Sequence, residues 1–175
     1  VYFIVTKDGR VQDMSLANLE DELDVEISSG GNSLDITIKQ ENTSWLTDWR
    51  NRYNVSMQII APRKTACDLR TSDGDIELMD FIGNQVCRTS DGNIEVEGIS
   101  GTVSARTSDG NIEALNISGE VELQTSDGNI LAENIEDDCS LRTSDGKLVA
   151  INIDGNVSAV TSDGNVHLEN VKGAH

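Results

Sequence analysis

The chain has 175 residues, a length that fits one domain, and only 3% of them are aromatic. It carries 31 acidic and 13 basic side chains, and the resulting net charge of −18 repels phosphate backbones, which excludes nucleic acid as a partner class. Such a charge attracts cations or basic proteins, or serves only to keep the protein soluble. No run of about 18 apolar residues occurs, so we expect no membrane span in this chain.

Residues 1–60 contain short stretches in which apolar and polar residues alternate, as they do in half-buried strands. Leu34–Ile38 and Val55–Ile59 show this alternation, and Ser28–Asn32 has the composition of a hairpin turn. The segment precedes a repeat, and the terminal units of repeat proteins are usually atypical because they must close the core. We therefore predict an irregular N-terminal β cap over residues 1–60, continuous with a solenoid over residues 61–175.

Three aromatic residues lie close together before the repeat, namely Trp45, Trp49 and Tyr53. Their spacing of four residues fits one face of a helical turn that plugs the end of the core. An exposed aromatic platform for a sugar or a protein partner is the alternative, and the sequence leaves both open.

The second part of the chain repeats with a period of 18 residues. The tetrapeptide Thr-Ser-Asp-Gly begins at Thr71, Thr89, Thr107, Thr125, Thr143 and Thr161. Self-similarity at a fixed short period is typical of solenoids, in which one unit cannot bury its apolar face alone and stacks on a copy of itself.

One repeat, residues 89–106, divides into two halves that each contain a glycine turn and a short alternating stretch. The pattern predicts an all-β, parallel β-solenoid of β-helix or β-roll type, with two short strands in each 18-residue coil. Ile94 and Val96 should point inward from one strand, Val103 and Ala105 from the other. Two aliphatic columns are expected in the core: Ile76, Ile94, Ile112, Ile130, Leu148 and Val166, and Phe81, Ile99, Ile117, Ile135, Ile153 and Val171.

The Thr-Ser-Asp-Gly turn suits a chain reversal, because Asp can accept a hydrogen bond from the backbone two residues on and Gly adopts positive φ at no steric cost. The opposite corner carries a second glycine column, in which Asp137 is the exception. Asp tolerates left-handed conformations better than most residues, so we expect Asp137 to fit there.

The turn aspartates should form a ladder along one edge: Asp73, Asp91, Asp109, Asp127, Asp145 and Asp163. Charges one strand spacing apart repel by roughly 3 kcal/mol at an effective dielectric of about 20. The favoured interpretation is a structural ladder whose charge is offset by arginines three residues upstream. A calcium ladder is the alternative, although Ca²⁺ prefers six to eight oxygen ligands and each Thr-Ser-Asp-Gly tetrapeptide supplies only one carboxylate. The upstream arginines are Arg70, Arg88, Arg106 and Arg142.

Cys67, Cys87 and Cys139 are odd in number and fall at inward slots of the repeat. We expect buried, reduced thiols. A bridge between Cys67 and Cys87 on neighbouring coils is the alternative in an oxidising compartment.

The outward positions are the ones free to carry function. Glu77, Glu95, Glu97 and Glu113 form an acidic stripe on the first strand of each coil. Farther along, the same slots become apolar at Leu115, Leu131, Val149 and Ile151. A contiguous apolar patch tends to mark contact with another surface, so these four residues are the candidate partner-binding face.

No arrangement of side chains indicates catalysis. His167 and His175 have no nucleophile or metal-ligand constellation at a meaningful spacing, and no glycine-rich phosphate loop leads into a helix. We expect no enzyme activity and no cofactor.

From Val55 onward the segments DLRTSDGDIEL and GISGTVSARTSDGNIE resemble the adhesin-type β-strand-repeat family of bacterial proteins, a domain family of unknown function. The resemblance covers residues 55–175. It implies a β-solenoid in an extracytoplasmic setting, periplasmic, cell-surface or secreted, and carries over no catalytic residues.

Together these features predict a non-enzymatic, envelope-associated binding or scaffold module of adhesin type, with a protein or glycan partner or a second copy. One alternative is a self-assembling element that associates through open solenoid ends or the apolar patch. A second alternative is a Ca²⁺-stabilised repeat protein.

Overall fold

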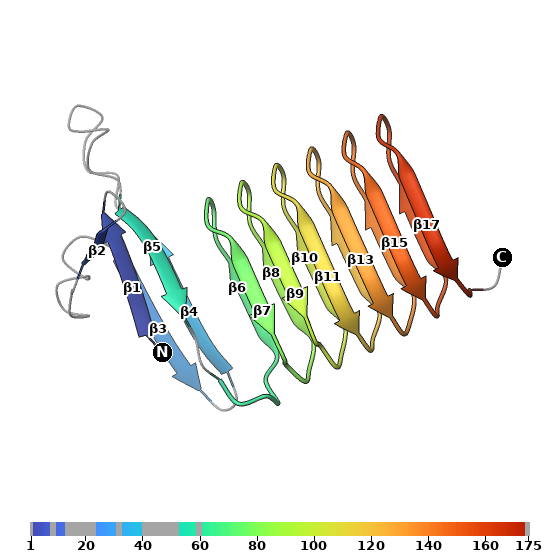
Figure 1. Cartoon of the computed structure of the whole chain (residues 1–175). Helices are drawn as coiled ribbons and strands as arrows, with labels where there is room; N and C mark the ends of the chain where they lie inside the picture. The colour runs from blue at the N-terminus through green and yellow to red at the C-terminus, as the bar shows by residue number, and fades with distance from the viewer. Residues whose placement is uncertain are drawn as a thin grey trace. The chain divides into compact units, whose positions relative to one another are not determined.

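The computed structural model describes residues 61–173 throughout and, within residues 1–60, the backbone of five strands (Figure 1). The chain divides into two compact units, residues 1–60 and residues 61–175. The described residues form strands and turns, without a helix. Accordingly, none of these residues belongs to a helix long and apolar enough to cross a membrane.

The first unit contains a three-stranded antiparallel sheet and a hairpin. The sheet has the order β2-β1-β5, and the hairpin consists of β3 and β4. The hairpin prediction is confirmed, and its ladder is longer than expected because pairing continues to Gly30 and Ser33. The strands are β1 (Tyr2–Lys7), β2 (Arg10–Gln12), β3 (Asp24–Gly30), β4 (Ser33–Lys39) and β5 (Tyr53–Gln58).

One expectation for this unit is wrong: Tyr53 begins strand β5 and is therefore not part of a helical turn. Its expected companions, Trp45 and Trp49, lie outside the described residues. That the unit caps the solenoid stays a prediction.

The second unit is a parallel β-solenoid of six coils, and the predicted fold is confirmed (Figure 1). Each coil contributes one strand to each of two six-stranded parallel sheets. The even sheet contains β6 (Cys67–Arg70), β8 (Gln85–Arg88), β10 (Val103–Arg106), β12 (Val121–Gln124), β14 (Cys139–Arg142) and β16 (Val157–Val160). The odd sheet contains β7 (Ile76–Met79), β9 (Ile94–Glu97), β11 (Ile112–Ile117), β13 (Ile130–Ile135), β15 (Leu148–Ile153) and β17 (Val166–Val171).

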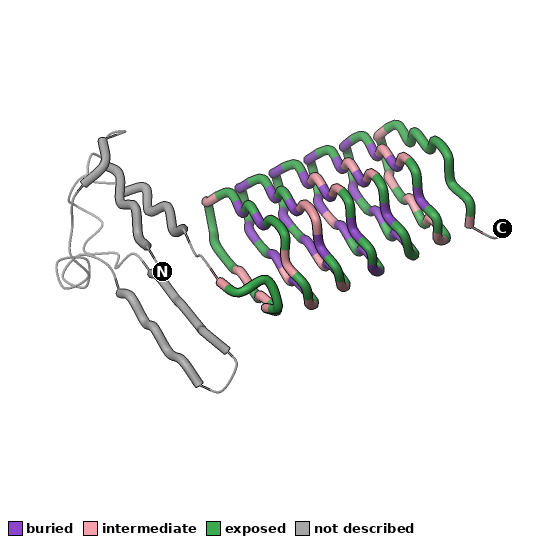
Figure 2. The backbone as a smooth tube through the Cα atoms, turned by 60° about the horizontal axis from the view of Figure 1, so that its bottom comes forward, coloured by how far each residue is buried: buried purple, intermediate pink, exposed green. Residues whose placement is uncertain are grey.

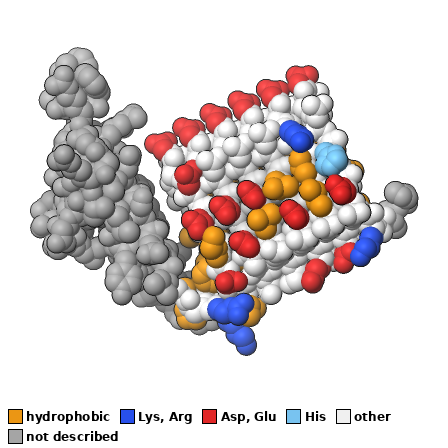
Figure 3. Space-filling model, viewed as in Figure 1, with side chains coloured by type: hydrophobic (Ala, Val, Ile, Leu, Met, Phe, Trp, Pro, Cys, Tyr) orange, Lys and Arg blue, Asp and Glu red, His pale blue; other side chains and the backbone are white. Residues whose placement is uncertain are grey.

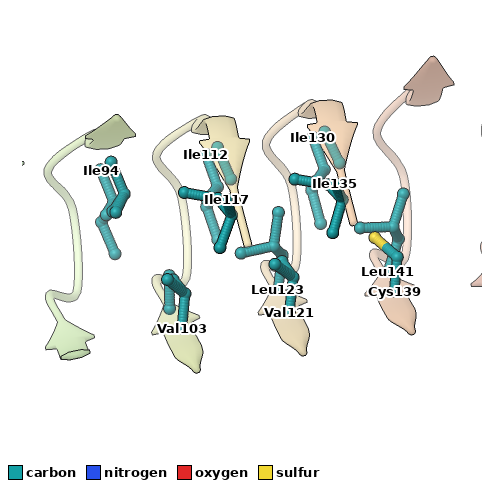
Figure 4. Packing of buried hydrophobic residues seen from close by; sticks show 14 of the residues in the cluster. Ile94, Val103, Ile112, Ile117, Val121, Leu123, Ile130, Ile135, Cys139 and Leu141 are labelled. Atoms are coloured by element: carbon teal, nitrogen blue, oxygen red, sulfur yellow. The ribbon is translucent and has the colours of Figure 1, made fainter. Parts of the chain in front are cut away.

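The register between strands is one full repeat, so equivalent residues of successive coils lie side by side. Ile112 pairs with Ile94 on one neighbour and with Ile130 on the other. Strand alternation then sends the whole column to one side of the sheet. The inward side chains of both sheets meet in a single narrow core (Figure 4).

The core is formed by the predicted inward residues, and the tube in Figure 2 shows buried positions recurring at the same place in the middle coils. Ile94, Val96, Val103 and Ala105 are each at most 2% exposed, which confirms their predicted orientation. On the last described coil the same columns end in exposed Val166, Leu168 and Val171.

The Thr-Ser-Asp-Gly corner is organised by its threonine. The hydroxyl of Thr107 accepts a hydrogen bond from the amide of Gly110 and donates toward the carbonyl oxygens of Ser90 and Gly92, both on the preceding coil. Thr107 is buried, as are the equivalent threonines of three other coils. The threonine therefore closes its own turn and ties it to the neighbouring turn.

The turn aspartates do not act as expected. Within residues 61–173, the side chains of the six turn aspartates make no hydrogen bond, and the turn glycines do not have positive φ. Glycine is needed for a different reason, because a Cβ on Gly110 would lie 1.9 Å from the carbonyl oxygen of Gly92. The stacked turns approach too closely for any side chain.

The opposite corner bends through a left-handed residue in every coil. Asn116, Asn134, Asn152 and Asn170 have φ between 54° and 58°, and Asp80 and Gly98 occupy the same slot in the earlier coils. The asparagine amides form a ladder in which, from Asn134 onward, each Nδ2 donates to the asparagine Oδ1 one coil earlier at 2.9–3.0 Å. Asp137 is not left-handed, contrary to expectation.

All three cysteines are free. Cys67 pairs in register with Gln85 and Leu69 pairs with Cys87, so the two thiols are diagonal neighbours. Diagonal Cα atoms in a sheet are about 7–8 Å apart, beyond the usual reach of a disulfide. Burial raises the pKa of the Cys87 and Cys139 thiols to about 12, with a smaller contribution from Cys67 at Cys87. Cys87 and Cys139 are therefore buried as expected, whereas Cys67 is only half-buried.

Candidate functional site

The outer face of the odd sheet carries two columns of outward side chains (Figure 3). In the first column three glutamates are followed by two aliphatic residues and a histidine, and in the second column aliphatic residues alternate with glutamates. The first column is Glu77, Glu95, Glu113, Leu131, Val149 and His167. The second column is Met79, Glu97, Leu115, Glu133, Ile151 and Glu169.

The four residues predicted to bind a partner form one patch, which we call the apolar patch. Leu131 and Val149 are register neighbours, and Val149 and Ile151 lie on the same face of β15. Leu115 is diagonal to Leu131 on the adjoining strand. All four are half-buried, so the patch presents an aliphatic surface while its members partly cover one another.

Carboxylates border the apolar patch on several sides (Figure 3). Glu113 is the register neighbour of Leu131, Glu133 lies between Leu115 and Ile151, and Glu169 follows Ile151 on the last coil. The surface therefore combines apolar area with negative charge, a combination that suits a cationic, partly apolar partner.

The outer face of the even sheet carries a column of arginines. Arg70, Arg88 and Arg106 follow one another in register on three consecutive coils. Arg70 and Arg88 both pair with Asp68, at 2.8 Å and 3.5 Å. The expectation that these two arginines neutralise the turn aspartates is therefore wrong. Arg142 continues the column after Gln124.

The turn aspartates lie in a row along the edge of the solenoid, as predicted, and all six are exposed. Successive turns are joined by backbone bonds such as that from the Asp109 amide to the Ser90 carbonyl oxygen, at 3.0 Å. No group of three or more His, Cys, Asp or Glu side chains in the described part of the chain is placed to hold a metal ion. The calcium ladder stays a prediction without a supporting cluster.

A shallow groove of about 620 Å³ runs along the asparagine corner. Its walls are the left-handed column and the next outward column, with Ser118, Glu136, Asp154 and Lys172 among the lining residues. Lys172 pairs with Asp154 at 2.7 Å. The walls are polar and several of their groups are already hydrogen-bonded to each other, so the groove is a weaker candidate than the apolar patch.

One of the two histidines lies on these surfaces. His167 is exposed at the end of the first outward column, 3.5 Å from Glu169. His175 lies outside the described residues.

Two features were missed by the sequence reasoning. The asparagine ladder had a signal, since Asp, Gly or Asn, the residues that best tolerate left-handed φ, recurs every 18 residues from Asp80. The unequal charge of the two outer faces also had a signal, because arginine precedes the turn and glutamate follows it in the first three repeats.

Comparison with known proteins places the chain in a family. No curated protein and no solved structure matches it. A family model described as Toastrack DUF4097, a domain of unknown function, matches residues 6–174. The match extends the resemblance seen in the repeats to almost the whole chain, while the adhesin-type label stays a prediction. The chain belongs to the Toastrack DUF4097 family.

Proposed function

We propose that the protein is a non-enzymatic binding or scaffold module whose odd sheet docks a protein partner that brings cations and aliphatic side chains. The observation that carries the proposal is the apolar patch, which lies on a flat, regular sheet and is bordered by carboxylates. The module acts in an extracytoplasmic setting, a part of the proposal supported by the resemblance of its repeats to envelope-associated domains.

Rigidity supports a binding role. Each strand of the middle coils is hydrogen-bonded on both edges, and the turn threonines and corner asparagines tie successive coils together. A surface built this way is ordered before its partner arrives, so docking costs little conformational entropy. A flat face without deep concavity suits another macromolecule better than a small substrate.

The chemistry of the face selects the class of partner. Aliphatic side chains gain from being covered, while a rim of carboxylates attracts cations and repels acidic surfaces. A partner with Lys or Arg beside an apolar strip satisfies both conditions.

A capture experiment with matched variants tests the proposal. The full chain is immobilised and exposed to an extract of the source envelope, and retained proteins are identified by mass spectrometry. Leu131→Asp places a charge in the apolar patch and should abolish retention of the partner. Ser140→Asp adds the same charge on the exposed outer face of the even sheet and serves as the control. If both variants retain the same proteins as the unchanged chain, the odd sheet is not the docking face.

A further inference from the structure

We propose that the cationic surface that fits the odd sheet is the even sheet of a second copy of this chain, so that copies associate side by side with their stacking axes parallel. The proposal rests on the proposed function, because it names the occupant of the same face. It follows from the positions of two charged columns relative to the Thr-Ser-Asp-Gly turn.

The arginine column and the glutamate column lie on opposite faces of the solenoid, at nearly the same distance from the Thr-Ser-Asp-Gly turn. Arg88 is the last residue of β8, immediately before the turn, and Glu95 is the first outward residue of β9 after it. The next coil repeats the arrangement with Arg106 and Glu113. If one copy is translated across the thickness of the solenoid, the arginine column of one copy meets the glutamate column of the other. The match recurs coil by coil, because both columns advance by one strand spacing.

The charges of the two columns are not balanced within one copy. Arg70 and Arg88 of the even sheet share the carboxylate of Asp68, and Arg106 has no ion pair within residues 61–173. The glutamates facing outward at Glu95 and Glu113 likewise have no ion pair in this part of the chain. Like charges stacked at strand spacing repel, and an opposing column of the other sign removes both repulsions at once.

Side-chain size is also complementary in the coils that follow. Ser140 and Ile151 lie at corresponding distances from the turn on opposite faces of one coil. The even sheet therefore has a small residue where the odd sheet has a large one. Arg142 corresponds to Val149, which its aliphatic stem can cover. Glu122 of the even sheet and Glu133 of the odd sheet correspond in the same way, and this pair is an exception because both residues are negatively charged.

The expected association is weak. Six strands of about four residues make a face of roughly 24 by 13 Å, smaller than a standard stable interface. Two copies, each with a net charge of −18, also repel each other as wholes. Association should therefore need high protein concentration or a shared surface that holds copies close together.

A charge exchange tests the proposal with the full chain. One variant carries Arg88→Glu and Arg106→Glu, so both of its faces are acidic. The other carries Glu95→Arg and Glu113→Arg, so the two columns that flank the turn are both basic in these two coils. In sedimentation velocity up to about 1 mM, the unchanged chain should associate, and each variant alone should associate at least about tenfold more weakly. An equimolar mixture of the two variants should recover association, because the substituted glutamates of one variant then meet the substituted arginines of the other.

Net charge alone cannot produce this pattern. The second variant moves the net charge toward zero, which by itself would favour association. If this variant nevertheless associates less than the unchanged chain, the cause is the local charge on the two faces. Lys64→Glu with Lys147→Glu adds the same negative charge as the first variant outside both columns and should behave like the unchanged chain. Circular dichroism melting confirms that the variants are folded.

Three outcomes would overturn the inference: a monomeric unchanged chain at the highest concentration, association that both variants retain, or a mixture that does not recover. Each leaves the proposed function standing if capture of a different partner still depends on Leu131. If capture is independent of Leu131 but the charge exchange works, the odd sheet binds only a second copy.

Discussion

The two sides of one strand behave differently along the stack. In β13 the inward residues Ile130 and Ala132 meet Ile, Leu or Ala in the adjoining coils, whereas outward Leu131 and Glu133 meet residues of changing character. The inward side chains pack on their own copies in a closed core, so each constrains its neighbours. The outward side chains have no such constraint, and charge and apolar area can be placed there to suit a partner.

The largest effect should come from charging the inner side. Val103 is 1% exposed and Val103→Asp would bury an unpaired carboxylate between the sheets. We expect a loss of about 4 kcal/mol or more, enough to unfold much of the unit. Urea unfolding followed by circular dichroism measures it. A shift below about 1 kcal/mol would mean that this position is not in the core.

The turn glycines extend the comparison to the edge of the core. Gly110→Ala places a methyl group 1.9 Å from the Gly92 carbonyl oxygen, so the stacked backbones must separate. The expected loss is about 2–3 kcal/mol. Gly74→Ala is the matched control from the first coil, where the added Cβ meets only the Thr71 side chain at 3.1 Å. Equal melting temperatures for the two variants would contradict the close stacking of turns.

The asparagine corner should be more tolerant. Asn134→Ala removes two amide bonds of the ladder and puts alanine at φ 57°. We expect a loss of about 1–2 kcal/mol. Asn134→Gly keeps the left-handed backbone, as Gly98 does in its own coil, and should cost less. If glycine and alanine are equally destabilising in thermal melts, the backbone conformation contributes little.

The smallest expected effect is a pH dependence of stability that arises from the buried cysteine thiols. Burial raises the pKa of the Cys87 and Cys139 thiols to about 12, above the value of about 8.5 for an exposed thiol. The thiols of the unfolded chain therefore lose their protons first as the pH rises. Their contribution to the free energy of unfolding is fully present below about pH 8.5 and decreases above it. The loss near about pH 9 should be roughly 0.8 kcal/mol per thiol. Melts of Cys139→Ala should show a weaker pH dependence, and an unchanged one would argue against burial of this thiol.

Much of the fold could be predicted from the sequence, because an 18-residue period fixes the register and strand alternation then fixes which side chains face the core. Ile112 and its column follow directly from this argument. The conformation of the corners was harder to predict, because turn type depends on close backbone contacts between coils that a single repeat does not reveal. The sequence predicts Gly110 in the turn, but the structure shows that close stacking and not positive φ requires the glycine, and the left-handed conformation of Asn134 is not predicted.

The candidate site could be predicted in position but not in its electrostatics. The alternation that places Leu131 outward also identifies the apolar patch. The partner of Arg88 could not be predicted in the same way, because the nearest carboxylate in sequence, on the turn, is not the one it contacts. Asp68 lies on the neighbouring strand, in the other outward column of the same sheet.

The most direct test of the account compares two neighbouring residues of β13, in which Leu131 faces outward and Ala132 is fully buried. The same charge is introduced at each, and unfolding in urea is measured for Leu131→Asp and Ala132→Asp. The account predicts a loss of several kcal/mol for Ala132→Asp and less than about 1 kcal/mol for Leu131→Asp. Equal losses, or a larger one at Leu131, would contradict the division of each strand into a fixed inner side and a free outer side.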